Sequence, residues 1–243
     1  MGSVVCDAVA VADDLELAAA IGRGAAGTST NGVTISRDLE VLTGNGCEVV
    51  VELTRADAAR EHASWLAAHG LHAVIGTSGL TDDDIADLAK LFTASNCIVA
   101  PNFAISAVLM MRFAAMAAPF FDSAEVIEFH HDGKVDAPAG TAIAVAERMA
   151  AASDTWAADA TQHEPIPGSR GARGPGVIRV HSVRMRGMVA HNEVVLGTTG
   201  QSLTIRQDSY DRSSYVPGVL LACRRIADRP GVTVGLDDLL ELD

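Results

Sequence analysis

The chain is organised around residues 128–142, which read EFHHDGKVDAPAGTA. An apolar run precedes the two histidines, so we expect a β-strand that ends at them. Pro138 suits the first turn of a helix, where its missing N–H leaves no hydrogen bond unmade, and an alanine-rich helical pattern follows it. The stretch therefore predicts a strand, a short loop and a helix in direct succession.

The same residues bring together chemical groups that suit a small anion. His130, His131 and Lys134 supply imidazole and ammonium groups close together in the sequence. If the helix starts here, the backbone N–H groups of Gly140 and Thr141 lie at its positive end, which is a common anion site. The combination indicates a pocket for a small polyanion that must be protonated.

A solvated turn is the alternative interpretation of this stretch. Asp132-Gly133 is a frequent pair in hairpin turns. Successive residues of a strand point to opposite faces, so His130 and His131 share a pocket only if the strand breaks between them. Composition alone leaves the two interpretations even.

Composition restricts the class of protein. A chain of 243 residues with 49% apolar and 4% aromatic residues suits helices stacked on a parallel sheet, in one domain or two. The net charge of −13 argues against nucleic acid or an anionic membrane as a partner. We see no apolar run of about 18 residues and no signal-peptide pattern, so we expect a soluble cytoplasmic protein. The four cysteines lack metal-ligand spacing, so we expect reduced core cysteines and no metal site.

Strands alternate with helices over the first hundred residues. We expect strands at 15–21, 48–53, 72–76 and 97–100, and helices at 1–12, at 56–69 and after Thr81. This alternation predicts a parallel sheet with right-handed crossovers. Ligands bind outside the carboxyl ends of such strands. Two segments that follow strands, Gly76-Thr77-Ser78 and Ala100-Pro101-Asn102-Phe103, therefore predict a nucleotide site, although each alone suits an ordinary turn.

The second half of the chain has a different pattern. A helix at 105–121 leads to a strand at 124–131, a helix ending near 152 and a Gly/Arg/Pro-rich loop at 163–176. Three strands at 177–184, 188–196 and 202–208 are expected to be antiparallel because short turns join them. A helix at 216–227 and a short helix near 236–242 follow. We infer an α/β domain (1–104), an inserted α+β domain (105–215) and a C-terminal helix (216–243) that packs back on the first domain.

Motifs along nearly the whole chain match one family. They read GTSG (76–79), APNFA (100–104), ExHHxxKxDAPxGT (128–141), RGARG (170–174), HSVR (181–184), GxVAH (187–191) and LTIR (203–206). On these motifs the chain resembles the dihydrodipicolinate reductase family. The resemblance implies a Rossmann-like parallel sheet with an inserted substrate and tetramerisation domain. It also implies NAD(P)H-dependent reduction of 4-hydroxy-tetrahydrodipicolinate to tetrahydrodipicolinate, in lysine and diaminopimelate biosynthesis, by a homotetramer.

The resemblance also implies roles for individual residues. His130 would be the general acid and Lys134 a second proton donor. The substrate carboxylates would be held by His131, Gly140 and Thr141. The binding site of the cofactor, NADPH or NADH, would be lined by Gly76, Thr77, Ser78, Ala100, Pro101, Asn102 and Phe103. Arg23 stands where the family commonly has an acidic residue that binds ribose, so it favours NADPH, although an arginine on a loop can equally be solvated.

The chain departs from the family at its start. The family opens with a strand and a Gly-x-x-Gly-x-x-Gly loop that binds pyrophosphate, whereas Met1-Gly2 leads directly into a helical pattern. The resemblance therefore predicts a sheet that lacks an interior strand and a site that lacks its main phosphate cradle. Either translation starts upstream of Met1, which we favour because the catalytic string is intact, or the chain is a truncated homologue. Such a homologue would be non-catalytic and would bind the dicarboxylate or assemble without cofactor.

Two smaller departures lie in the second half. Ala139 stands where serine is common, and Gln207 replaces a common histidine. An aldehyde dehydrogenase of similar layout is a further alternative, but it requires a cysteine nucleophile beside a base, and no cysteine here has that setting.

Overall fold

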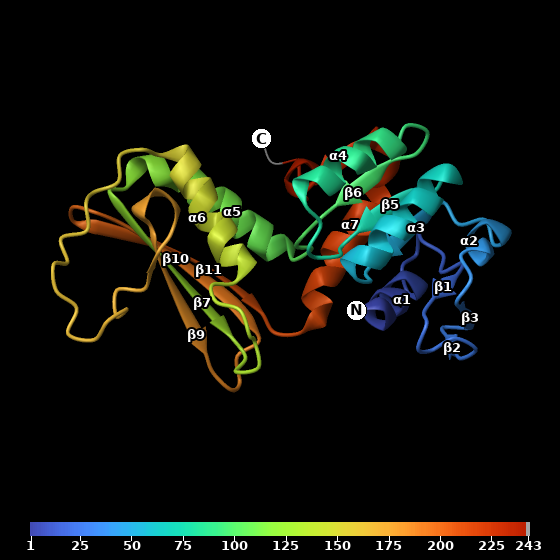
Figure 1. The fold of residues 1–243 in the computed structure, drawn as a ribbon, viewed down its shortest axis with the longest axis horizontal. Coiled ribbons are helices and arrows are strands. Elements are labelled where there is room, and N and C mark those ends of the chain that lie inside the picture. The colour runs from blue at the N-terminus through green and yellow to red at the C-terminus, as the bar shows by residue number, and fades with distance from the viewer. Residues whose placement is uncertain (242–243) are drawn as a thin grey trace. The chain divides into compact units, whose positions relative to one another are not determined.

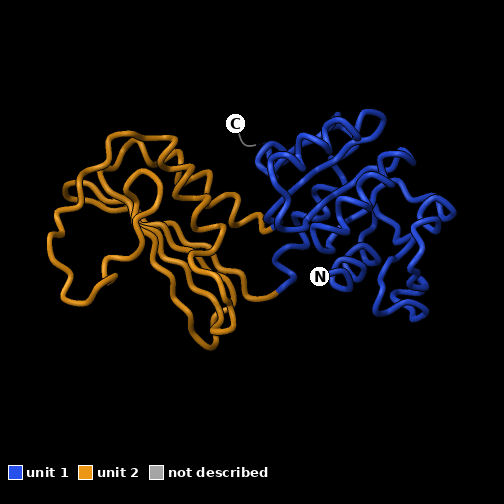
Figure 2. The backbone as a smooth tube through the Cα atoms, viewed as in Figure 1, with its two compact units in different colours: residues 1–103, 212–243 blue, residues 104–211 orange. Residues whose placement is uncertain are grey.

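The computed structural model describes residues 1–241, which form two compact units. Unit 1 contains residues 1–103 together with the chain from residue 212 onward, and unit 2 contains residues 104–211 (Figure 2). Unit 2 is thus inserted in the sequence of unit 1. Among residues 1–241, no helix is both long and apolar enough to span a membrane.

Unit 1 is built on a parallel sheet of four strands (Figure 1). In spatial order these are β12 (Val232–Val234), β6 (Cys97–Val99), β5 (His72–Ile75) and β4 (Val49–Glu52). The helices that pack on the sheet are α3 (Ala56–Ala68), α4 (Asp82–Leu91) and α7 (Val216–Arg225). β6 is buried throughout and β5 nearly so, which is typical of a parallel sheet covered on both faces. The predicted Rossmann-like sheet is therefore confirmed.

The start of unit 1 differs from the predicted strand at 15–21. Only β1 (Ala20–Ile21) forms ladder hydrogen bonds, and it pairs with β3 (Val33–Ser36), which in turn pairs with β2 (Ser29–Thr30). Residues 15–19 lie outside this small sheet, so the prediction was too long. α1 (Gly2–Ala10) precedes it.

A cavity of about 610 Å³ separates β1 from β4 and is also lined by α1. β4 is the edge of its sheet, and no strand within residues 1–241 joins β1 to β4. The arrangement agrees with the prediction that the parallel sheet lacks an interior strand.

Unit 2 contains a mixed sheet of five strands and two helices. In spatial order the strands are β11 (Gln201–Ser209), β10 (Ala190–Thr198), β7 (Ser123–His130), β9 (Arg179–Arg184) and β8 (Ala172–Arg173). α5 (Ile105–Ala117) and α6 (Gly140–Ala152) pack together and cover one face of the sheet (Figure 1). Along β7 the buried residues Ala124, Val126 and Glu128 therefore face the helices, and the alternate residues lie on the opposite face. The predicted α+β unit is confirmed.

The predicted pairing of the last three strands is correct for β10 and β11, which are antiparallel, but wrong for β9. β9 pairs in parallel with β7, which lies between β9 and β10. The helix α6 connects β7 to β9, and a connection of this length is what a parallel pair requires. The short turn after β9 passes over the end of β7 and leads to β10 on its other side. In this turn Met185 N donates to His130 O at 3.0 Å.

Short elements complete the described chain. They are α2 (Glu40–Gly44) and the 3₁₀ helices η1 (Ala118–Phe120), η2 (Pro175–Val177), η3 (Arg212–Tyr215), η4 (Ile226–Asp228) and η5 (Asp237–Leu239). The predicted helix near 236–242 is thus the single turn η5, and residue 242 lies outside the described residues. The sequence does not predict β12, because three residues between glycines carry too short an apolar pattern.

Candidate functional site

The stretch at 128–142 forms the predicted strand, loop and helix in unit 2. β7 ends at His130, and α6 starts at Gly140 with Ala139 as its N-cap residue. Pro138 therefore precedes the helix and does not lie in its first turn, which corrects the prediction. Gly140 and Thr141 are the first two residues of α6, as the predicted anion site requires.

A buried carboxylate lies at the centre of this stretch. Glu128 has no exposed surface, and its Oε2 accepts from Nδ1 of His130 at 2.5 Å and from Nη1 of Arg184 at 2.8 Å. Its Oε1 accepts from Nη2 of Arg184 at 2.8 Å and from the backbone N of Ala139 at 3.2 Å. Burial alone would raise the pKa of Glu128, but hydrogen bonds from Arg184, Ser182 and His130 outweigh it and hold that pKa at about 2. Glu128 is therefore an anion at neutral pH.

His130 is the imidazole next to this carboxylate. Its side chain is 13% exposed. Burial lowers the pKa of His130 below its ordinary value, the hydrogen bond and charge of Glu128 raise it in part, and the charges of Lys134 and Arg184 lower it again. The surroundings of the imidazole thus disfavour its charged form.

Lys134 lies on the loop between β7 and α6. Its Nζ donates to both carboxylate oxygens of Asp136, at 2.7 and 2.8 Å, and its side chain is 21% exposed. The hydrogen bond from Lys134 lowers the pKa of Asp136. Since its charge also acts on His130, Lys134 belongs to the same cluster.

His131 has a different setting from His130. It is exposed, and a Cβ placed on Gly133 would lie 3.3 Å from its Nδ1, so its ring lies over the turn that follows. In that turn the backbone N of Lys134 donates to the His131 carbonyl at 3.1 Å. The turn interpretation of Asp132-Gly133 is therefore correct locally, and it coexists with the buried cluster around His130.

Sequence reasoning gave no role to Glu128, Arg184 or Ser182. Glu128 could have been found, because it lies two residues before His130 and hence on the same face of the strand. Arg184 reaches the site only through the register of β9 on β7, which pairs it with His130. No sequence signal predicts that register.

The predicted cofactor residues lie at the carboxyl ends of neighbouring strands in unit 1. Gly76, Thr77 and Ser78 follow β5, and Ala100 to Phe103 follow β6. The two strands are parallel neighbours, and Ala100 N donates to Ile75 O at 2.9 Å. The structure thus brings both predicted segments to one edge of the sheet.

Gly76 is tightly enclosed at this edge. A Cβ on Gly76 would lie 2.5 Å from the Phe103 ring and 2.7 Å from Leu53, so only glycine fits without displacing a neighbour. The Thr77 hydroxyl, which is buried, donates to the Thr54 carbonyl at 3.1 Å and links the ends of β4 and β5. Ser78 and Pro101 are exposed.

Arg23 lies on the exposed loop after β1, and its carbonyl accepts from Nε of Arg37 at 3.2 Å. Its charge contributes to the lowered pKa of Asp57, after a backbone hydrogen bond and Arg55. Because Asp57 is in the first turn of α3, which follows β4, Arg23 lies near the carboxyl end of β4.

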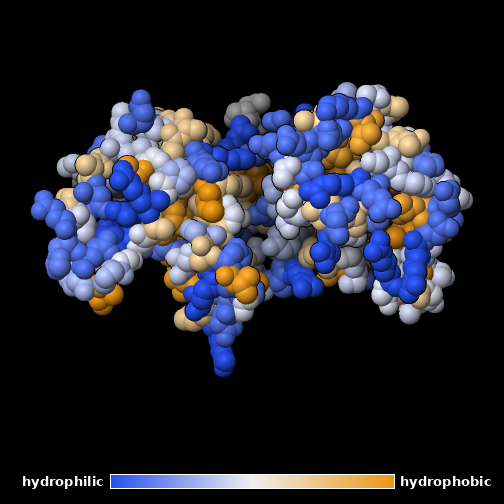
Figure 3. All heavy atoms as spheres, in the orientation of Figure 1, coloured by the Kyte–Doolittle hydropathy of each residue, from blue (hydrophilic) through white to orange (hydrophobic). Residues whose placement is uncertain are grey.

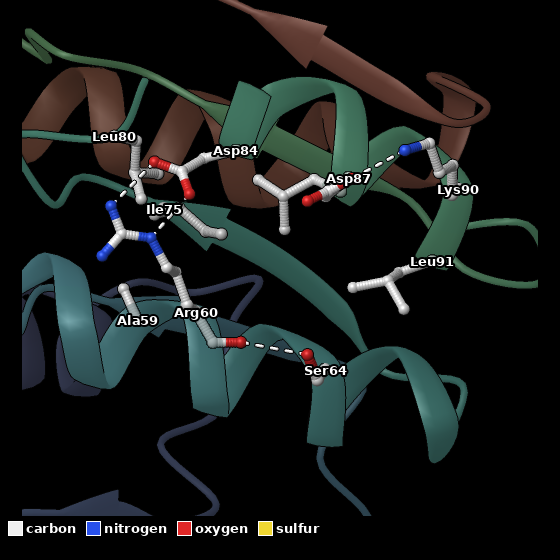
Figure 4. Close-up of a pocket in the computed structure, with 10 residues that line it drawn as sticks. Ala59, Arg60, Ser64, Ile75, Leu80, Asp84, Asp87, Lys90 and Leu91 are labelled. Atoms are coloured by element: carbon white, nitrogen blue, oxygen red, sulfur yellow. Dashed lines mark hydrogen bonds and ion pairs between the residues drawn. The ribbon is translucent and has the colours of Figure 1, made fainter. Parts of the chain in front are cut away.

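Asp84 anchors the start of α4, the helix that follows Gly76, Thr77 and Ser78 in the chain. It forms a capping box with Thr81 at the start of α4, and Arg60 of α3 donates to both its oxygens, at 2.6 and 2.8 Å (Figure 4). The hydrogen bond from Arg60 holds the pKa of Asp84 well below its usual range. The nearby cavity of about 350 Å³ has an apolar floor, and its rim charges pair with one another, Arg60 with Asp84 and Lys90 with Asp87.

Comparisons with known proteins agree along the chain. Residues 1–103 match the family model for the dihydrodipicolinate reductase N-terminus, and residues 106–240 match the model for its C-terminus. The chain is 48% identical over 247 residues to a 4-hydroxy-tetrahydrodipicolinate reductase of Corynebacterium aurimucosum, and 48% identical over 249 residues to that of Nocardia farcinica. Each alignment covers 100% of this chain and 95% of the relative.

Solved structures give the same result. A dipicolinate-bound dihydrodipicolinate reductase from Paenisporosarcina sp. TG-14 is similar with a TM-score of 0.88 and 33% identity, over 98% of this chain and 94% of that one. An amine dehydrogenase from Mycobacterium smegmatis has a TM-score of 0.62 at 13% identity, over 96% and 91% of the two chains. That second likeness concerns the fold alone.

Proposed function

The chain belongs to the dihydrodipicolinate reductase family, and from this premise we propose that it reduces 4-hydroxy-tetrahydrodipicolinate to tetrahydrodipicolinate with NADPH or NADH. The reaction serves lysine and diaminopimelate biosynthesis. The observation that carries the proposal is the cluster at the end of β7. There a largely buried imidazole, an ammonium group and the first turn of α6 lie on one short stretch.

The protein's part in the reaction is to bind a dianion and to supply a proton. Gly140, Thr141 and His131 hold the substrate carboxylates, since helix N-termini and imidazole groups favour anions. The bound dianion raises the pKa of His130, which burial has lowered, and His130 then donates a proton to the site where electron density accumulates. Lys134 is the second proton donor.

The residues at the edge of the parallel sheet fit a dinucleotide. Phe103 and Leu53 fill the space that a Cβ of Gly76 would take, so this packing holds the end of β5 at the carboxyl edge of the sheet, where folds of this kind bind dinucleotides. Gly76, Thr77, Ser78 and the segment from Ala100 to Phe103 would hold the nicotinamide half. When bound, the reduced cofactor supplies the hydride. Arg23, near the end of β4, would favour the 2′-phosphate of NADPH.

We also propose that the protein is a cytoplasmic homotetramer assembled through unit 2. The support is the sheet face opposite α5 and α6, which carries half-buried Ile127, Phe129, Val183 and Val195.

A steady-state assay tests the proposed activity. The purified protein should oxidise NADPH only when the product of the preceding synthase is supplied. His130→Gln should lower kcat by about 10²–10⁴-fold, the usual contribution of a general acid. Retained turnover in that variant would remove His130 from its role.

A second candidate function is dicarboxylate binding without cofactor, and one observation favours it. The open edge of β4 and the cavity beside it leave the dinucleotide side of unit 1 less complete than the substrate side. Calorimetry separates the two functions. Binding of dipicolinate together with no detectable binding of NADPH or NADH would support the second.

A further inference from the structure

We infer that Glu128 is the positioning residue for His130: it holds the Nδ1–H of the imidazole, so that Nε2 is the atom that gives up the proton. The inference rests on the proposed function and adds a residue to it. Glu128 and His130 lie two residues apart on β7, and therefore on one face of the strand. Their 2.5 Å contact joins Oε2 to Nδ1.

The charge state of Glu128 makes it an acceptor at all working pH values. An ionised carboxylate only accepts hydrogen bonds, so the nitrogen that faces it must carry a hydrogen. Arg184 binds both oxygens of Glu128 and, with Ser182 and His130, keeps its pKa at about 2 in spite of complete burial. The neutral imidazole is therefore the Nδ1–H tautomer, with its lone pair on Nε2.

The proton transfer follows from this tautomer. In the charged imidazolium both nitrogens carry hydrogen. During the reaction the Nε2–H bond breaks, its electron pair stays on Nε2, and the proton bonds to the substrate. The Nδ1–H···Glu128 hydrogen bond persists throughout, so the ring keeps its orientation before and after the transfer.

The same carboxylate connects the imidazole to the other predicted substrate contacts. Its Oε1 accepts from the backbone N of Ala139, the N-cap residue of α6. Arg184, bound to Glu128, also donates to the carbonyl of Asp136 at 2.6 Å, and the side chain of Asp136 pairs with Lys134. One buried anion thus fixes the imidazole, the start of α6 and the loop that carries Lys134.

The kinetic test is Glu128→Gln, which keeps the shape of the side chain and removes its charge. The expected result is a fall in kcat of about 10²–10⁴-fold, as when the carboxylate behind a catalytic histidine is replaced by an amide, with the KM for NADPH changed less than about threefold. Because Glu128 raises the pKa of His130, its loss should also move the alkaline limb of the kcat profile to lower pH. A structural role alone would leave that limb in place.

The matched control is Glu147→Gln, the same change at an exposed position of α6. It should keep both kcat and the pH limb of the wild type. If Glu128→Gln behaves like this control, the inference is overturned.

A second measurement needs no Glu128 variant and no activity. In ¹⁵N-histidine NMR of the whole wild-type chain, the signal of His130 is identified by its loss in His130→Gln. Above its pKa, His130 should have the chemical shifts of the Nδ1–H tautomer, and a predominant Nε2–H tautomer would overturn the inference. If the wild type reduces no dicarboxylate, the proposed function fails, yet the tautomer still decides the role of Glu128.

Discussion

At the residue scale, the imidazole of His130 is subject to opposing electrostatic effects. Burial and the charges of Lys134 and Arg184 lower its pKa, whereas Glu128 raises it, and the balance is a pKa below the ordinary value of histidine. If the substrate dianion binds next to the ring as proposed, its negative charge raises that pKa. Ligand binding and protonation of His130 are therefore coupled.

This coupling predicts that binding of dipicolinate takes up protons near neutral pH. His130 is mainly neutral in the free protein above its lowered pKa and charged in the complex, so uptake should approach one proton between the two pKa values. Affinity should decrease as the pH rises through the pKa of the complex. Calorimetry in buffers of different ionisation enthalpy measures the uptake. It should vanish in His130→Gln, and unchanged uptake in that variant would assign the proton to another group.

A second prediction concerns Gly76. In Gly76→Ala the new Cβ would meet the Phe103 ring and Leu53 at 2.5 and 2.7 Å, so one of them must move. Overpacking of this kind costs about 1–3 kcal/mol. If about half of that cost appears in the complex, the affinity for NADPH falls by about two- to tenfold, as fluorescence titration would show.

Gly44→Ala is the control for Gly76→Ala. It makes the same change in α2, where a Cβ would meet no atom within 4 Å. Its affinity for NADPH should equal that of the wild type. Equal affinities in both variants would exclude Gly76 from the cofactor site.

At the element scale, two carboxylates on α4 have contrasting roles. Asp84 closes the capping box with Thr81 and accepts both hydrogen bonds from Arg60, whereas Asp87 forms an exposed pair with Lys90 (Figure 4). We expect Asp84→Ala to lower the midpoint of thermal unfolding by a few degrees, because it removes a helix cap and the link between α3 and α4. Asp87→Ala should leave the midpoint unchanged, since exposed pairs contribute little. Equal midpoints for the two variants would contradict this account.

The pH dependence of the same contact has a defined sign. The pKa of Asp84 is lowered in the folded chain, chiefly by Arg60. Its contribution is therefore present above the unfolded pKa and is lost as the pH falls through the folded one. The difference in midpoint between Asp84→Ala and the wild type should thus shrink in strong acid.

The sequence predicted most elements because their apolar patterns are long or their caps are explicit. Thr81 with an acidic first turn placed the start of α4, and the run to His130 placed the end of β7. The sequence-based prediction failed where the position of a strand depends on which other strands it pairs with. β9 was assigned to the wrong neighbour because local turns do not reveal a strand inserted between two others.

The residues of the candidate site also fall into two groups, those that the local sequence predicts and those that it does not. His130, Lys134 and Gly140 were predicted as site residues because they lie on one continuous stretch of sequence. Arg184 was given no role, because it arrives from another strand through the parallel register of β7 and β9. Pro138 was placed in the helix from its usual preference, whereas Ala139 takes the N-cap and donates its N–H to Glu128. Contacts of this kind depend on tertiary structure and have no signature in the local sequence.

At the scale of the whole molecule, the net charge of the chain differs in sign from the charge of the groups gathered around Glu128. The chain carries a net charge of −13, yet the cluster around Glu128 gathers His130, Lys134 and Arg184. In this cluster Glu128 pairs with Arg184 and Asp136 with Lys134, so we expect protonation of His130 to supply the net positive charge that an anionic substrate needs against the overall field. Apolar residues form patches separated by hydrophilic ones on the face that Figure 3 shows.

The proposed tetramer leads to the last prediction, which concerns the uncovered sheet face of unit 2. Ile127 lies at the middle of β7 on that face, paired in register with Glu193 of β10 and His181 of β9. In Ile127→Asp a carboxylate replaces apolar surface beside Glu193, so association through this face should weaken and sedimentation velocity should show a smaller species. The matched change Ile166→Asp lies at a position that is 73% exposed on the long loop of unit 2, and it should sediment as the wild type. If Ile127→Asp keeps the wild-type mass while Ile166→Asp loses it, the assembly uses the loop and not the sheet.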